Sequence, residues 1–191
     1  MSKVKPSRQD AIEAIKILID YIGDSSERLD LQDTPERVIK SYSELFKGYG
    51  QNAGDVLQKN CLDTANFQDI VLLKNIYFTS CCEHHMLPII GNISIAYIPN
   101  KKVVGISKLV RVVEVFSRRL QLQERMTKQI ADALEESLQP VGVAVKVSAK
   151  HCCMSLRGVR QENNEMVTTC FTGQFKENAS SRAEFINLIK D

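Results

Sequence analysis

Two short segments hold most of the residues that could bind a metal or transfer protons. The segment "TSCCEHHMLP" spans residues 79–88, and "AKHCCMSLRG" spans residues 149–158. Together they contain all three histidines and four of the six cysteines in a chain of 191 residues. Thiolates and imidazoles are preferred zinc ligands, and both also serve as catalytic groups. The pattern predicts that the two segments meet at one site.

The spacing within each segment restricts which side chains can share a metal. Cys82 and His85 are three positions apart, which places both on one side of a helical turn. His151 and Cys153 are two apart and would share one face of a strand. These four donors allow either a closed four-ligand site or a three-ligand catalytic site with a histidine left over. Because the chain has no Cys-x-x-Cys pair of the structural kind, catalysis is favoured over structural zinc and over core packing of the cysteines.

A third segment, "GISKLVR" at residues 105–111, is a candidate anion site. Ser107 is the predicted cap of a helix, and Lys108 and Arg111 follow in its first turn. Cations there oppose the helix dipole, at about 0.3–1 kcal/mol each. A phosphate bound at the helix start would reverse this penalty, and Arg157 could add another cation. From the residues alone, a solvated surface explains the charges equally well.

The segment "LQLQERMT" places Gln123 and Glu124 at a joint between two helices. An acidic residue at the start of a helix is ordinary, because the helix dipole favours it. The alternative is a carboxylate that accepts two N–H donors from a planar ligand. The residues alone favour the ordinary interpretation.

The elements that must position these groups follow from the hydrophobic pattern. Apolar residues at helical spacing predict helices over residues 7–22 and 33–48, and β-branched runs predict strands over 69–80 and 91–99. Two helices with a joint near residues 118–123 follow, and then strands and a closing helix are predicted over residues 141–149, 165–175 and 180–191. The order β-β-α-α-β-β predicts an α+β fold with helices on one face of an antiparallel sheet. We expect a helical arm at residues 1–60 and a catalytic domain at residues 61–191.

Composition limits the partners and the compartment. A net charge of +2 gives no field that would favour nucleic acid or a membrane surface. The isoleucines near the N-terminus are interrupted by charges at Asp10, Glu13, Lys16 and Asp20, so we expect neither an export signal nor a membrane span. The expected compartment is the cytoplasm, where thiols stay reduced and cysteines serve as ligands, nucleophiles or core residues.

The motifs taken as a set resemble one family. "CEHH", "GISKLVR", "QLQERMTKQIADAL" and "HCCMSLRGVR", in this order, closely resemble GTP cyclohydrolase I over roughly residues 30–190. The resemblance implies the tunnelling fold, an antiparallel sheet with two helices between its second and third strands. It also implies a decamer of two stacked pentameric rings with active sites between subunits. The implied reaction converts GTP and water into 7,8-dihydroneopterin triphosphate and formate, on the route to folate or tetrahydrobiopterin.

The resemblance also implies roles for individual residues. The zinc ligands are expected to be Cys82, His85 and Cys153. His84 and His151 are then free to transfer protons. The implied substrate-binding residues are Gln123 and Glu124 for the guanine ring, and Ser107, Lys108, Arg111 and Arg157 for the ribose and triphosphate.

This chain departs from the family pattern by doubling each ligand cysteine, at Cys81 and Cys152. These residues could replace the ligands, form disulfides when oxidised, or face away from the metal, and the last is favoured because neighbours on an extended chain point to opposite sides. Cys61 and Cys170 match no motif and are interpreted as packing residues. Alternatives to the full reaction are a purine- or pterin-binding zinc protein without turnover, a relative with a nucleophilic cysteine, and an enzyme that stops at the formamide.

Overall fold

The computed structural model describes residues 5–58, 61–63 and 66–190. Its contacts divide the chain into two compact units, Met1–Lys47 and Gly48–Asp191. The division therefore falls earlier than the predicted domain boundary at residues 60/61. The reason is the short helix α3 (Ala53–Gln58), which packs against two helices of the larger unit and buries Leu57 completely.

The smaller unit is a pair of helices. Helix α1 (Arg8–Tyr21) begins with a capping box, in which the Ser7 hydroxyl accepts from the Asp10 N–H at 3.1 Å and the Asp10 carboxylate accepts from the Ser7 N–H at 2.8 Å. Helix α2 (Thr34–Leu45) packs against it, and Arg8 forms an ion pair with Glu36 across the two helices. This unit also contains the 3-10 helix η1 (Leu29–Leu31). The helices predicted in this region are confirmed.

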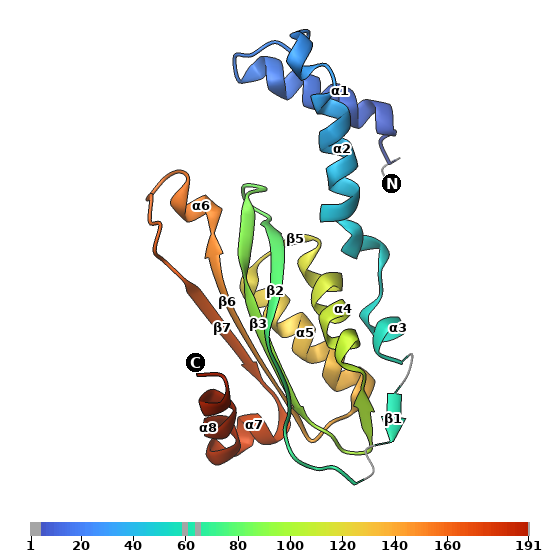
Figure 1. Cartoon of the computed structure of the whole chain (residues 1–191), viewed down its shortest axis with the longest axis vertical. Coiled ribbons are helices and arrows are strands. Elements are labelled where there is room, and N and C mark those ends of the chain that lie inside the picture. Colours follow the sequence, from blue (N-terminus) through green and yellow to red (C-terminus); the bar gives the residue numbers. More distant parts are fainter. Residues whose placement is uncertain (1–4, 59–60, 64–65, 191) are drawn as a thin grey trace. The chain divides into compact units, whose positions relative to one another are not determined.

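The larger unit is built on a five-stranded sheet in the order β5-β2-β3-β6-β7 (Figure 1). All neighbouring strands are antiparallel except the short β5, which runs parallel to β2. The strands are β2 (Val71–Cys82), β3 (Pro88–Ile98), β5 (Leu120–Gln121), β6 (Gly142–His151) and β7 (Met166–Phe171). A separate two-stranded sheet pairs β1 (Cys61–Asp63) with β4 (Lys102–Val104).

Two long helices cover one face of the main sheet, as Figure 1 shows. Helix α4 (Ile106–Ser117) and helix α5 (Gln123–Leu138) lie between β3 and β6 in the chain, in the predicted place. The core lies between their apolar faces and the inner face of the sheet, and it includes Val112, Ile130 and Val145, all fully buried. This arrangement confirms the predicted α+β fold with two helices between the second and third long strands.

The C-terminal part differs from the prediction in one respect. The strand expected over residues 165–175 ends at Phe171, and the helices α7 (Gly173–Glu177) and α8 (Ala179–Leu188) follow. Gly173 has a φ of +47°, and a Cβ there would lie 2.1 Å from the Val141 carbonyl oxygen. A left-handed conformation with no room for a side chain ends the strand at this point.

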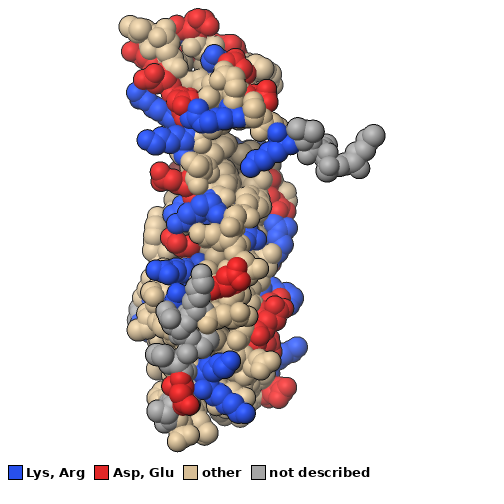
Figure 2. Space-filling view, turned by 90° about the vertical axis from the view of Figure 1, so that its right-hand side faces the viewer, with Lys and Arg blue, Asp and Glu red and all other residues tan. Residues whose placement is uncertain are grey.

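The sheet register brings the two ligand segments to one end of the larger unit. Cys81 pairs with Pro88 and with Leu120, while Ile89 pairs with His151. The end of β2, the end of β6 and the start of α5 therefore meet there, together with the one-turn helix α6 (Cys152–Ser155). On the face shown in Figure 2, acidic and basic side chains are interspersed rather than gathered by sign. None of the helices in the described part of the chain has both the length and the hydropathy of a membrane span.

Candidate metal centre and active site

Three side chains form a compact group of potential metal ligands. The Cys82 sulfur, a ring nitrogen of His85 and the Cys153 sulfur all lie within 4.8 Å of one another. Cys82 ends β2, and a tight turn follows in which the Met86 N–H donates to the Cys82 carbonyl at 2.8 Å. The turn returns His85 to the side of Cys82, while α6 brings Cys153 to the same place from the end of β6.

This group fits zinc. Two thiols and one imidazole match a catalytic zinc site, which uses three protein ligands and keeps a fourth position for water or substrate. Burial raises the pKa of the Cys153 thiol, and the neighbouring Cys82 thiol raises it further. A dication would hold the Cys153 sulfur as a thiolate, and its binding would release that proton. Among the described residues, His151 does not belong to this group. The three-ligand alternative is thus the one that the geometry supports.

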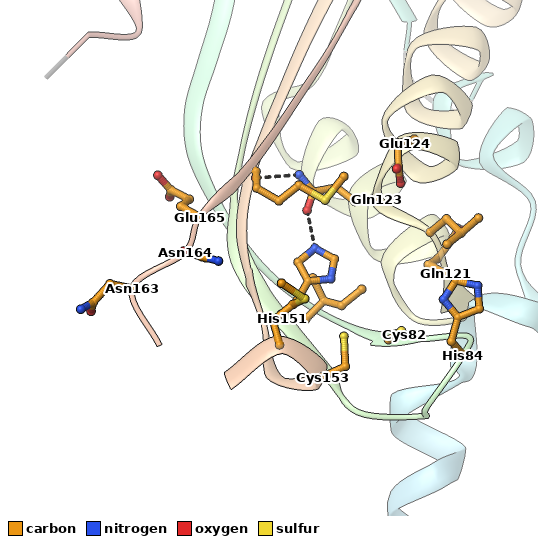
Figure 3. A pocket seen from close by; sticks show the side chains of 14 residues that line it. Cys82, His84, Gln121, Gln123, Glu124, His151, Cys153, Asn163, Asn164 and Glu165 are labelled. Carbon is orange, nitrogen blue, oxygen red and sulfur yellow. Dashed lines mark hydrogen bonds between the residues drawn. The ribbon is translucent and has the colours of Figure 1, made fainter. Parts of the chain in front are cut away.

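Cys82 and Cys153 of the ligand group line a cavity of about 620 Å³, which is the size of a small-molecule site (Figure 3). Its lining comes from β2 and the turn after it, from β3, β5, α5, β6 and α6, and from the start of β7 with the loop before it. The polar lining residues are Cys82, His84, Gln121, Gln123, Glu124, His151, Cys153, Asn163, Asn164 and Glu165. One cavity thus contains two of the candidate ligands and both predicted proton-transfer histidines.

The two histidines of the cavity differ in their surroundings. His84 is exposed on the turn after β2. His151 is half-buried at the end of β6, and its Nε2 lies 2.8 Å from the Gln123 Oε1. Burial lowers the pKa of His151, and the nearby Glu124 carboxylate partly opposes this shift. His151 is thus held by a hydrogen bond to another side chain of the cavity, whereas His84 is exposed.

The two predicted guanine-binding residues also differ. Glu124 is exposed in the first turn of α5 and lines the cavity, so its carboxylate is free to meet a ligand. The Gln123 side chain is 1% exposed, and both ends of its amide contact other protein groups. The structure therefore offers Glu124, but not the Gln123 side chain, as an accessible hydrogen-bonding group.

The predicted phosphate-binding residues are divided between two places. The Arg157 Nη1 lies 2.9 Å from the His85 Nε2, next to the ligand group. Ser107, Lys108 and Arg111 lie in the first turns of α4, which begins at the end of the unit opposite α6 (Figure 1). A helix of 12 residues is about 18 Å long, so these side chains do not line the cavity of their own chain.

The start of α4 corrects one detail of the sequence prediction. Its N-cap is Gly105, not Ser107, because the Lys108 N–H donates to the Gly105 carbonyl at 2.8 Å and the helix begins at Ile106. Ser107 is therefore inside the helix. Lys108 is only 8% exposed, whereas Arg111 is exposed.

Sequence reasoning missed a polar network beside the ligand group. Arg125 forms an ion pair with Glu83, and its Nε donates to the Gln121 Oε1 at 3.2 Å. The Gln121 Nε2 in turn donates to the Phe116 carbonyl at 2.9 Å. The network ties the turn that carries His84 to the start of α5. Glu83 and Arg125 carry opposite charges, and each follows or precedes a predicted site residue in its own motif. This pairing of charges is the sequence signal that could have predicted the network.

The doubled cysteines are not part of the ligand group. Cys81 and Cys152 are half-buried free thiols, and Cys152 lines a separate cavity of about 240 Å³. Burial raises the pKa of the Cys81 thiol, and the neighbouring Cys82 thiol raises it further. Their placement agrees with the favoured interpretation that they face away from the metal. Cys61 falls where the structure describes no side chain.

Fold and site together define an α+β protein with a three-ligand Cys–His–Cys group of the zinc-binding kind beside a cavity of small-molecule size. Residues 11–190 match the family model described as GTP cyclohydrolase I. The chain belongs to the GTP cyclohydrolase I family. The ligand group is consistent with the zinc site of that family.

Individual relatives agree with the family assignment. The chain is 54% identical over 184 residues to "GTP cyclohydrolase 1" of Rickettsia felis, covering 96% of this chain and 97% of the relative. It is 53% identical over 188 residues to "GTP cyclohydrolase 1" of Rickettsia bellii, with 98% of each chain covered. A crystal structure of the archaeosine synthase QueF-Like in the apo form is 20% identical and covers 55% of this chain and 93% of its own, with a TM-score of 0.46.

Proposed function

We propose that this chain converts GTP and water into 7,8-dihydroneopterin triphosphate and formate, the entry step of pterin biosynthesis. One observation carries the proposal. The zinc-type donors Cys82, His85 and Cys153 lie within 4.8 Å of one another, beside a cavity that also holds two histidines and an exposed glutamate. Family membership over residues 11–190 supports the same reaction.

The ligand group accounts for the most difficult part of the chemistry. C8 of a purine is a poor electrophile, so water must be activated near neutral pH. Cys82, His85 and Cys153 would hold zinc, which would supply this activation as a Lewis acid by lowering the pKa of water from about 15.7 toward about 7. The remaining work of orientation and proton transfer belongs to the chain's own residues.

His84 and His151 are proposed as the proton-transfer groups. Imidazoles suit this role because their ordinary pKa of about 6.5 lets them donate and accept near neutral pH. Both side chains line the cavity. His151 is assigned to the purine ring, and the exposed His84 is assigned to ribose opening.

Glu124 is proposed to hold the guanine edge by accepting two of its N–H donors. Its position in the first turn of α5, at the cavity wall, supports this role. Holding the base there would fix C8 relative to the ligand group, and such orientation lowers the barrier without further chemistry.

We further propose that the triphosphate is bound across a subunit boundary in a homodecamer of two pentamers. Arg157 lies next to His85, whereas Ser107, Lys108 and Arg111 lie in the first turns of α4, which is about 18 Å long and begins at the opposite end of the unit. These three residues would then serve the cavity of a neighbouring subunit. A cytoplasmic location is proposed as well, because the ligand thiols must stay reduced.

Mixing two inactive variants tests the shared site. Cys153→Ser removes a zinc ligand, and Arg111→Ala removes a phosphate contact at the other end of the subunit. If sites are shared, assemblies refolded from a mixture of the two variants recover activity, because some sites combine intact parts. Recovery that never exceeds the sum of the separate variants would place Arg111 and Cys153 in the same chain's site.

The reaction itself is tested by incubating reduced protein with GTP while following formate and the near-UV pterin chromophore. Both products should form, and both should be lost after chelation and return with zinc. Formate without pterin would mean ring opening without closure. GTP binding without either product would favour a purine-binding zinc protein that does not turn over.

A further inference from the structure

The orientation of one buried amide is fixed by its surroundings. The Gln123 Nε2 lies 2.8 Å from the Met166 carbonyl oxygen, 3.3 Å from the Val147 carbonyl oxygen and 3.2 Å from the Thr168 Oγ1. Carbonyl oxygens can only accept hydrogen bonds, so the amide end that faces them must be the NH2 group. The reversed amide would place the Gln123 oxygen against two carbonyls at the site of a buried side chain, which is strongly unfavourable.

The neighbouring hydroxyls agree with this orientation. The Thr127 hydroxyl donates its single proton to the Gln123 backbone carbonyl at 2.7 Å. In the 2.7 Å contact between Thr127 and Thr168, the proton must therefore come from Thr168. The Thr168 oxygen keeps its lone pairs for the Gln123 NH2 group. One arrangement of protons thus satisfies every member of the network, and it leaves the Gln123 Oε1 as a pure acceptor.

That oxygen faces His151. Its distance to the His151 Nε2 is 2.8 Å, and Figure 3 shows this bond together with the one on the other end of the amide. Because an amide oxygen carries no proton, the ring nitrogen must supply one. The neutral His151 ring is therefore the Nε2–H tautomer, with its free lone pair on Nδ1.

We propose that Gln123 is a positioning residue that fixes the tautomer and the ring orientation of His151, with Nδ1 as the ring nitrogen that carries no proton. This inference rests on the proposed function for the identity of the substrate. It gives the Gln123 side chain a role other than the guanine contact implied by family resemblance, and leaves Glu124 as the side chain that meets the base.

The proton balance of the arrangement is simple. A water or substrate O–H in the cavity gives its proton to the His151 Nδ1, and the ring becomes an imidazolium with both nitrogens protonated. The other proton stays on Nε2 and keeps its hydrogen bond to the Gln123 Oε1, whose partial negative charge stabilises the cation. The Nδ1 proton is then returned to a basic atom of the substrate, which restores the original tautomer.

The tautomer can be read directly by solid-state nitrogen NMR of the zinc-loaded full chain labelled with ¹⁵N-histidine. The chain has only three histidines, so each imidazole is resolved by comparison with His151→Asn. At about pH 8, well above the usual imidazole pKa of about 6.5, His151 should show a protonated Nε2 and an unprotonated Nδ1. A protonated Nδ1 in the wild-type protein would overturn the proposal.

Two variants separate positioning from general packing. Gln123→Met removes the acceptor and should release His151 from the single tautomer. Gln121→Met is the matched control, because Gln121 is 2% exposed at the same cavity and its amide also bonds a backbone carbonyl, at 2.9 Å to Phe116. It should leave the His151 signal unchanged. The same change in both variants would show loosening of the cavity and contradict the proposal.

A conservative variant covers the case in which Gln123→Met does not fold. In Gln123→Glu, one carboxyl oxygen still accepts from the His151 Nε2–H, while a protonated second oxygen can donate to the Met166 carbonyl. The Nε2–H tautomer should persist in this variant. Its loss there would contradict the assignment even if Gln123→Met gave no usable protein.

Kinetics distinguish positioning from a direct guanine contact. Gln123→Met should lower kcat about 10- to 100-fold, at or below the lower end of the roughly 10²–10⁴ contributed by general acid–base catalysis. The KM for GTP should change little. A raised KM at unchanged kcat would restore the guanine contact and overturn the positioning role. If the wild-type protein does not turn over GTP, the proposed function fails, while the NMR result still decides the tautomer.

Discussion

Gly91, near the start of β3, is a position at which a single methyl group should be strongly destabilising. A Cβ there would lie 2.1 Å from the Ser148 carbonyl oxygen and 2.6 Å from the Cα and Cβ of Ala149. Gly91 pairs with Ala149 on β6 and with Phe78 on β2. Two of the three obstructing atoms are backbone atoms, so Gly91→Ala must push two central strands apart.

The magnitude follows from this geometry. Overpacking a well-packed interior costs typically about 1–3 kcal/mol. Because the contacts here are far inside van der Waals distance and no flexible side chain can yield, we expect the upper end, about 3 kcal/mol. For a chain of this size, each kcal/mol lowers the melting temperature by about 2–4 °C, so the expected fall is about 6–12 °C. His151 lies two residues beyond Ala149, so the cavity should be disturbed as well.

The assay is thermal unfolding of both proteins at the same protomer concentration, because oligomer stability depends on concentration. Gly50→Ala is the matched control, since no heavy atom lies within 4 Å of a Cβ at that position. The control should be neutral or up to about 1 kcal/mol more stable. Equal melting temperatures for the two variants would refute the close approach of β3 and β6.

Three further predictions concern the site and its surroundings. Cys153→Ser should reduce zinc content and abolish formate release, whereas Cys170→Ser should retain both. Arg125→Gln should break the ion pair with Glu83 and lower activity about 10- to 100-fold, as loss of partners around metal ligands typically does. Arg37→Gln, in an exposed ion pair, is the control and should keep the wild-type activity. Equal activities of the two variants would contradict a role for the Arg125 network. Burial raises the pKa of the Cys170 thiol, and the Asp132 carboxylate raises it further. At about pH 8 the folded protein therefore holds less Cys170 thiolate than the unfolded protein, so alkylation of Cys170 should be slower in folded than in urea-unfolded protein.

Much of the fold was predictable because its long elements carry strong patterns. The β-branched runs predicted β2 and β3, and the two apolar faces predicted α4 and α5. The joint near residues 118–123 was also predicted, but not that Leu120 and Gln121 form the short strand β5 against the end of β2. A two-residue strand has no periodicity of its own, and only the tertiary pairing defines it.

The candidate site was predictable as a set of residues but not as an arrangement. Spacing brought Cys82, His85, His151 and Cys153 together, yet it could not decide which histidine was left over. The answer depends on where β6 ends and on the buried amide of Gln123, which are properties of the folded chain. Likewise, the length of α4 separates Lys108 from the cavity, and no local pattern reveals that separation.

The central claim is that Cys82, His85 and Cys153 bind zinc at the wall of the cavity. Zinc-edge X-ray absorption of the purified, reduced protein tests it most directly. One zinc per chain should be surrounded by two sulfurs at about 2.3 Å and by nitrogen or oxygen at about 2.0–2.1 Å. Four sulfurs would bring Cys81 and Cys152 into the site, and no sulfur would place the metal elsewhere; either result would contradict the account.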